Sequence, residues 1–459
     1  MRKPRGRASR SEPTHAGLYH QRVSPSVRLG LPSGIGLVVS NMVGAGVFVS
    51  AGFMAQDLGP GTLLLAWLAG ALIALAGARA YATVAVWVPR SGGEYRYLSD
   101  LLHPALGYLA GWASLLLGFS APLAVNALAA GAFARTLEPS LEPAAFATAL
   151  IVGLAALHSL GLRSSKVTQN LLVVLDVALL AGFVVVGLGL GAHAWPEWTP
   201  PNASDGFPMD AFARSLFYVA FAFSGWNAAV YAAEEFGNPR RDVPRSMLLG
   251  CAGVALLYLA VNWVFVANLT PDQGRVVFEY EETRVTLGHV VVRELVGPAG
   301  GQAMSVLVVA AFASAASAMT LVGPRVYAAM ARDGFLPRAV AGVDGRPPAV
   351  SIWMQAAIAL LLVFTHTLQQ VLMNVGALLT LFAALTSFSV FTARVSRPEL
   401  PRPGAVSLAA AGLHVASSAF LLYFGFRDSL RMVAWVAVVA ACALVAYAVS
   451  RALRARPAR

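Results

Sequence analysis

Charged side chains are scarce in this chain of 459 residues. Asp, Glu, Lys and Arg together make up 12% of it, whereas hydrophobic residues make up 58%. A soluble domain usually carries about 25% charged residues, so the composition excludes an ordinary soluble protein and indicates a membrane protein with several spans. Cysteine is also rare, since only Cys251 and Cys442 occur, in separate apolar runs. We therefore expect no disulfide framework and no metal cluster.

Acidic residues are fewer than basic ones, and the formal net charge is +11. Such an excess can indicate a nucleic-acid-binding protein, but here the arginines fall in alternate loops between apolar runs rather than on one patch. Alternate basic loops are the pattern of the positive-inside rule. We therefore expect both termini in the cytoplasm, no nucleic-acid partner and, because no early apolar core is present, no cleavable signal peptide.

Long apolar runs are abundant. Because a span needs about 20 apolar residues, the sequence predicts about twelve transmembrane helices in the cell membrane. The predicted spans cover residues 31–55, 62–88, 104–134, 143–161, 168–191, 211–234, 246–269, 299–323, 348–366, 369–393, 404–425 and 431–451.

The domain organisation follows from these spans, since no coiled coil, low-complexity block or soluble module interrupts them. We divide the chain into a cytoplasmic tail (1–28), a first repeat of five spans (29–192), a second repeat of five spans with an external loop (193–394), and two further spans with a cytoplasmic tail (395–459). Each repeat opens with an interrupted helix, which is the pattern of an inverted repeat. The fold class expected is an all-α integral membrane protein.

Two apolar runs are interrupted by short glycine-containing stretches. Residues 223–226 interrupt the run from 212 to 233, and residues 43–48 interrupt the run from 29 to 55. Within hydrocarbon, a broken helix is tolerated only where it lines a cavity or is buried in protein. Two interrupted segments in corresponding halves of a chain indicate a secondary transporter with its site near the middle of the membrane. We therefore expect a ligand site between the two breaks.

Several motifs occur in order among the spans, namely Gly44–Phe48, Pro89–Tyr97, Phe221–Asn227, Glu234–Arg245 and Arg325–Pro337. On these motifs the chain resembles the amino acid–polyamine–organocation superfamily, and within it the amino acid permeases of the light-chain transporter type. The resemblance extends from about Leu29 to about Val449. It implies the leucine-transporter fold, a 5+5 inverted repeat plus two helices, with alternating access. It implies no particular partner subunit.

The breaks suit a zwitterion. Freed N–H groups at the start of a half-helix favour a carboxylate, and freed carbonyls at the end of the preceding half-helix can accept hydrogen bonds from an ammonium. Close helix packing at the small residues is the alternative. The candidate substrate-binding residues are Asn41, Val43, Gly44, Ala45, Gly46, Phe221, Ala222, Phe223, Ser224 and Gly225.

Gate residues are suggested by position. Phe221 falls where the resembled family places an aromatic lid, although packing is the ordinary role of such a side chain, and Trp226 follows the second break. Glu234, Glu235 and Arg240 lie at the predicted cytoplasmic mouth, where ion pairs formed in one state only would bias the equilibrium between states.

Asp176 is the charged residue in an otherwise uncharged run from 171 to 186. An ionisable residue in a span is a candidate functional group. Relatives often carry a lysine at the position that we align with Asp176, and its ammonium takes the place of a sodium ion. The carboxylate could instead exchange a proton, bind sodium with Ser314, Ser317 or Thr320, or stay protonated or paired. We expect no cofactor beyond a coupling H⁺ or Na⁺.

The function expected is a secondary transporter for amino acids, and not an enzyme. Neutral substrates are favoured because the stretches 118–126 and 215–227, expected to face the site, contain no acid. A transporter for polyamines or other amines, or an amino acid exchanger of the same fold, is the alternative. A membrane enzyme using Asp176 with His158 or His366 lacks any HExxH or GxSxG motif, and a transporter-like nutrient sensor would lack an output domain.

Overall fold

The structure is a computed structural model, and it describes residues 28–160, 162–203, 205–272, 286–342, 348–428 and a few positions between 437 and 448. The first half contains α1 (Leu31–Met42), α2 (Ala45–Met54), α3 (Pro60–Trp87), α4 (Gly93–Leu101), α5 (Pro104–Ala113), the π-helix η2 (Ser114–Phe119), α6 (Ser120–Leu137), α7 (Pro143–Leu160) and α8 (Leu162–Leu190).

The second half contains α9 (Met209–Ala222), α10 (Ala228–Tyr231), the short 3₁₀ helix η3 (Ala233–Glu235), α11 (Pro239–Ala267), α14 (Leu287–Val296), α15 (Pro298–Arg332), α16 (Arg338–Ala341), α17 (Ala349–Thr365), α18 (Leu368–Ser396) and α19 (Ala405–Asp428). The described residues form no named strand, and one isolated parallel bridge joins Leu29 to Phe236. This architecture confirms the all-α expectation.

Proline marks the start of several long helices. Pro60, Pro104, Pro239 and Pro298 each occupy the first turn of a helix. At this position the missing N–H costs nothing, because the first N–H groups of a helix have no partner within it. The long apolar runs then continue as helices because hydrocarbon leaves the backbone no other way to pair its polar groups.

Nine helical segments within the described residues are long and apolar enough to cross a membrane, and α17 is a shorter apolar helix. The predicted span 211–234 is broken into α9, α10 and η3, so it does not form one continuous helix. The predicted span 431–451 lies mostly outside the described residues. Every other predicted span corresponds to a helix, or to consecutive helices, of the bundle.

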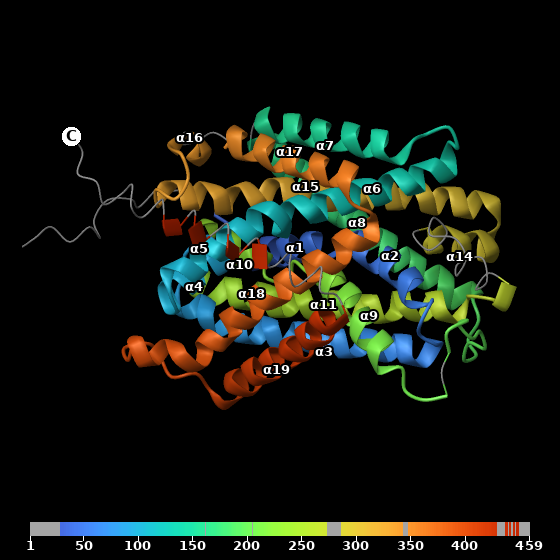
Figure 1. Ribbon diagram of the computed structural model, residues 1–459. Coiled ribbons are helices and arrows are strands. Elements are labelled where there is room, and N and C mark those ends of the chain that lie inside the picture. Colours follow the sequence, from blue (N-terminus) through green and yellow to red (C-terminus); the bar gives the residue numbers. More distant parts are fainter. Residues whose placement is uncertain are drawn as a thin grey trace, which may run out of the picture.

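The helices pack so that corresponding members of the two predicted repeats meet. The second helix of the first repeat, α3, packs against α11, and the third, α6, packs against α15. Figure 1 shows α7 and α17 along one side of the bundle and α3 and α19 along the opposite side, with α4 and α16 at one end and α14 at the other. The interrupted helices α1–α2 and α9–α10 lie within the bundle (Figure 1).

Candidate functional site

Both predicted interruptions are real breaks in the helices. α1 ends at Met42 and α2 begins at Ala45, with Val43 and Gly44 in extended conformations between them. α9 ends at Ala222 and α10 begins only at Ala228. The sequence therefore located both breaks.

The two breaks lie directly against each other because glycine occupies the contact points. A Cβ atom at Gly225 would lie 2.4 Å from the carbonyl oxygen of Asn41, and a Cβ at Gly46 would lie 2.4 Å from the Cα atom of Ala222. Gly225 also has φ of +100°, a conformation that other L-residues rarely adopt. Glycine at these two positions thus permits the close approach of the two interrupted helices.

Part of the freed backbone at the first break is already paired by side chains. The N–H of Ala45 donates to Asn126 Oδ1 at 2.8 Å, and Asn126 Nδ2 donates to the carbonyl of Pro122 at 2.8 Å. The hydroxyl of Tyr258 donates to the carbonyl of Met42 at 2.5 Å. Asn126 thus occupies one N–H group of the stretch that we expected to bind a carboxylate.

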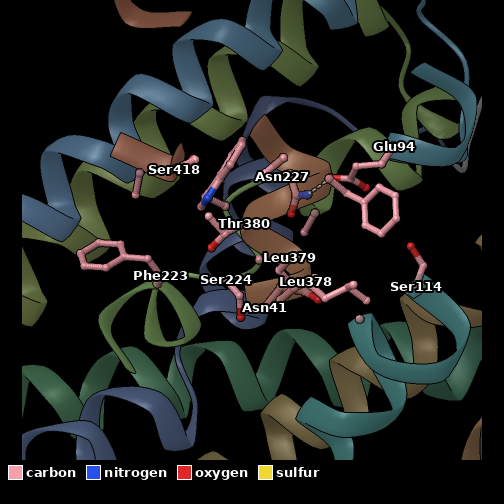
Figure 2. A pocket seen from close by; sticks show the side chains of 18 of the residues that line it. Asn41, Glu94, Ser114, Phe223, Ser224, Asn227, Leu378, Leu379, Thr380 and Ser418 are labelled. Carbon is pink, nitrogen blue, oxygen red and sulfur yellow. Dashed lines mark hydrogen bonds between the residues drawn. The ribbon is translucent and has the colours of Figure 1, made fainter. Parts of the chain in front are cut away.

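A cavity of about 110 Å³ lies beside the breaks. Its wall includes residues of the π-helix η2, the 223–228 stretch and helices α1, α3, α4, α9, α15, α18 and α19. Figure 2 shows Asn41, Phe223 and Ser224 along one part of this wall and Asn227 between them and Glu94. The cavity therefore connects the second break to the beginning of α4.

The predicted substrate-binding residues divide into two groups in the structure. Four of them line the cavity: Asn41, Phe223, Ser224 and Gly225. The remaining six are buried next to it without being part of its wall: Val43, Gly44, Ala45, Gly46, Phe221 and Ala222.

Of the two phenylalanines at the second break, Phe223 lines the cavity, whereas the predicted lid Phe221 is buried in the core. Phe223 packs edge-on against Tyr258, with ring centroids 5.3 Å apart. Trp226 also lines the cavity and contacts Tyr81 edge-on at 4.7 Å. Both rings are therefore held in place by other aromatic rings.

Glu94 is a wall residue that the sequence analysis missed. Its carboxylate accepts hydrogen bonds from three side chains, the hydroxyls of Tyr81 at 2.9 Å and Tyr231 at 2.7 Å and the amide of Asn227 at 2.5 Å. The motif Pro89–Tyr97 contains this residue, but it lies outside the predicted spans. Gly93, with φ of +56°, turns the chain so that Glu94 enters the bundle, which the sequence alone does not reveal.

Asp176 is fully buried in α8. Ser314 of α15 donates a hydrogen bond to the Oδ2 atom of Asp176 at 2.6 Å, whereas the Oδ1 atom has no hydrogen-bond partner within the described part of the chain. Ser317, the second predicted partner, instead pairs with Nε2 of His158 at 2.9 Å. Thr320 donates to the carbonyl of Ala316. Of the predicted hydroxyls, only Ser314 has a hydrogen bond with Asp176.

The predicted mouth carries ion pairs at the end of the bundle where α4 lies. Nε of Arg325 lies 2.7 Å from Oε1 of Glu235, and Arg96 lies 2.8 Å from Asp333. Glu234 and Arg240, the other charged gate candidates, have exposed side chains.

A metal site is not supported in the part of the chain that the structure describes, where no three or more His, Cys, Asp or Glu residues are grouped to hold an ion. Cys251 is buried in α11, and Cys442 lies outside the described residues. His366 lies at the end of α17, where its Nδ1 atom pairs with the hydroxyl of Thr365.

Comparison with known proteins adds relatives that extend over most of this chain. A family model described as amino acid permease matches residues 29–449. Large neutral amino acids transporter small subunit 2 of Homo sapiens is 26% identical over 436 residues, which cover 92% of this chain and 79% of the relative. The b(0,+)-type amino acid transporter 1 of Homo sapiens is 26% identical over 86% of this chain and 81% of its own. Asc-type amino acid transporter 1 of Mus musculus is 26% identical over 428 residues, which cover 88% of this chain and 78% of the relative.

Proposed function

The chain belongs to the amino acid permease family, and from this premise we propose that it carries neutral amino acids across the cell membrane by alternating access. The observation that supports this most directly is the meeting of two broken helices beside a cavity. Ser224 and Gly225, from the second break, and Asn41, from the end of α1, all lie on the wall of that cavity. Backbone groups freed by the breaks can recognise the amino and carboxylate groups common to all amino acids.

The preference for neutral side chains is supported by the remaining wall. Large apolar residues supply much of it: Ile73, Leu216, Leu378, Leu379 and Leu421. An apolar wall of this kind binds a hydrocarbon side chain by removing its surface from water. The names of two relatives, the large neutral amino acids transporter subunit and the Asc-type amino acid transporter, describe amino acid carriers.

We further propose that Asp176 couples transport to a proton gradient. Its carboxylate is buried and, among the residues that the structure describes, accepts one hydrogen bond, from Ser314, while Oδ1 has no partner. A buried carboxylate is costly in its charged form unless a cation or several donors compensate it. No ion pair to Asp176 is found among the described residues. Of the three hydroxyls expected to share a sodium ion with Asp176, only that of Ser314 is hydrogen-bonded to it, which favours a proton over sodium.

Uptake of a panel of radiolabelled amino acids into proteoliposomes tests both the carrier proposal and the proton-coupling proposal. The sodium gradient and the proton gradient are imposed separately. We expect accumulation driven by the proton gradient in the unmodified protein, and accumulation no greater than in protein-free liposomes for Asp176→Asn. Exchange of labelled for unlabelled substrate should persist in Asp176→Asn, because exchange requires no net movement of protons.

Asp57→Asn is the matched control, since Asp57 is a partly exposed acid beyond α2, 3.9 Å from Arg214. We expect it to accumulate substrate as the unmodified protein does. Accumulation that depends on sodium alone, or that persists in Asp176→Asn, would contradict the proton proposal. Absence of uptake of every amino acid would contradict the carrier proposal itself.

A further inference from the structure

Glu94 is a buried acid on the wall of the candidate substrate cavity, and nothing in the proposed transport cycle yet uses it. Its exposed fraction is 7%, and it is part of the cavity wall. The wall is otherwise mostly apolar or formed by neutral polar groups. Glu94 therefore places an acidic group at one end of the cavity, whereas the other lining residues include no Asp or Glu.

All three hydrogen-bond donors to Glu94 are neutral. Tyr81 and Asn227 donate to Oε1, and Tyr231 donates to Oε2. Among the residues that the structure describes, no arginine or lysine forms an ion pair with Glu94. Neutral donors compensate a buried carboxylate only in part, whereas a cation or a charged donor compensates it more strongly.

The carboxylate also retains acceptor capacity. An ionised carboxylate has about four acceptor positions on its two oxygens. Tyr81 and Asn227 occupy Oε1, while Oε2 accepts from Tyr231 alone. One acceptor position on Oε2 therefore receives no hydrogen bond from the described residues, and Glu94 lies on the cavity wall.

The second break and Glu94 line the same cavity, and Asn227 joins them. Asn227 lies three residues beyond Ser224, so their Cα atoms are separated by at most about 11 Å. The side chain of Asn227 then reaches Glu94 directly, as the dashed line in Figure 2 shows. A ligand whose amino and carboxylate groups are held at Ser224 and Gly225 can therefore extend its side chain toward Glu94.

We propose that Glu94 is a specificity-determining residue that accepts a hydrogen bond from an N–H group at the end of the substrate's side chain. The cavity then prefers a neutral amino acid that ends in an amide over an apolar amino acid of similar length. This inference rests on the proposed function, because it requires the common groups of an amino acid to bind at the break.

Matched pairs of substrates test the inference in proteoliposomes. Glutamine and methionine have similar lengths, and asparagine and leucine have the same branched shape. In the unmodified protein we expect a lower KM for the amide-bearing member of each pair. In Glu94→Gln we expect the ratio of the glutamine KM to the methionine KM to rise about ten-fold, because a hydrogen bond assisted by the charge of the carboxylate is lost. The ratio of the asparagine KM to the leucine KM should rise less, because the shorter asparagine side chain extends less far toward Glu94.

Asp100→Asn is the matched control, because Asp100 is an acid of the same helix, α4, that pairs with Arg90 and does not line the cavity. We expect this variant to leave both ratios as they are. Unchanged ratios in Glu94→Gln would overturn the inference. An equal loss of uptake for all four substrates would also overturn it, since this would show that Glu94 serves to hold α4 against α10.

A second variant decides the question if Glu94→Gln does not fold. Tyr231→Phe removes the donor to Oε2 and leaves the carboxylate in place, so we expect the preference for glutamine over methionine to increase. A preference that stays the same or falls would overturn the inference. Failure of the proposed function is distinguishable, because the unmodified protein would then take up none of the four substrates, which would overturn both proposals.

Discussion

Gly225 determines how closely the two interrupted helices approach at the candidate site. Its φ of +100° lies in the region that favours glycine, and an added Cβ would lie 2.4 Å from the carbonyl oxygen of Asn41. Contacts this short do not occur for real Cβ atoms, and the opposing atom belongs to the backbone of α1. The first helix would therefore have to move away from the second break to admit any side chain.

The substitution Gly225→Ala is expected to lower the stability of the folded protein by about 1–3 kcal/mol, through backbone strain and displacement of α1. The initial uptake rate should fall by more than the loss of folded protein explains, because Asn41 and Ser224 would no longer lie on the wall of one cavity. The thermal unfolding temperature in detergent and the initial uptake rate measure the two effects. Gly253→Ala in α11 is the control, since no atom lies within 4 Å of its added Cβ; equal effects from both variants would contradict this account.

The two buried acids show what could be predicted for single residues. Asp176 was found from the sequence because it is the one charge in an apolar run, and the structure buries it. Glu94 was not found, because it stands in a polar stretch among Ser91, Arg90 and Arg96 that resembles an ordinary loop. Its burial depends on Tyr81 of α3, 13 residues away, and on Tyr231 of α10, 137 residues away in the sequence. The stretches 118–126 and 215–227, which we expected to face the site, contain no acid, and the acid on the cavity wall comes from outside them.

At the scale of elements, α4 and the end of α15 are joined where the predicted cytoplasmic mouth lies. Arg96 of α4 pairs with Asp333 after α15, and Arg325 of α15 pairs with Glu235 of η3. Both pairs are partly exposed, with side-chain exposure between 17% and 32%. Exposed ion pairs contribute about 1 kcal/mol or less, so these contacts can bias an equilibrium between two states without locking either one.

Removal of one pair should therefore open this end of the bundle more often. In Arg325→Gln we expect a cysteine placed at Ser114, on the cavity wall, to react with a maleimide up to about five-fold faster in inside-out vesicles. The double charge swap Glu235→Arg with Arg325→Glu should restore the original rate. Arg402→Gln, an exposed arginine in the connection between α18 and α19, serves as the control. A rate that stays raised in the double swap would refute the ion-pair explanation.

At the scale of the whole molecule, the family match and the helical bundle confirm the expected leucine-transporter fold. Corresponding helices of the two predicted repeats pack in pairs, α3 with α11 and α6 with α15. The boundaries proposed for the repeats and tails stay a prediction. The orientation in the membrane also stays a prediction, which rests on the distribution of arginines among the loops.

Labelling of single cysteines tests the orientation. In a chain with Cys251→Ala and Cys442→Ala, we expect a cysteine at Asn202 to react with an impermeant maleimide on intact cells. A cysteine at Glu399 should react only after the membrane is permeabilised. Both side chains are exposed, so burial does not explain a difference between them. The reverse pattern would place both termini outside and contradict the orientation.

The sequence by itself determined the helical membrane fold, the two helix breaks and the buried acid in α8. These features depend on local patterns, since the length of an apolar run, an interruption by glycine and an isolated charge can each be recognised within about 25 residues. Only the tertiary structure decided which residues surround the cavity. It placed Phe223 rather than Phe221 on the wall, paired Ala45 with Asn126, and brought Glu94 to Asn227. These contacts join residues far apart in the chain, because the packing of helices against one another determines which face of each helix meets the cavity.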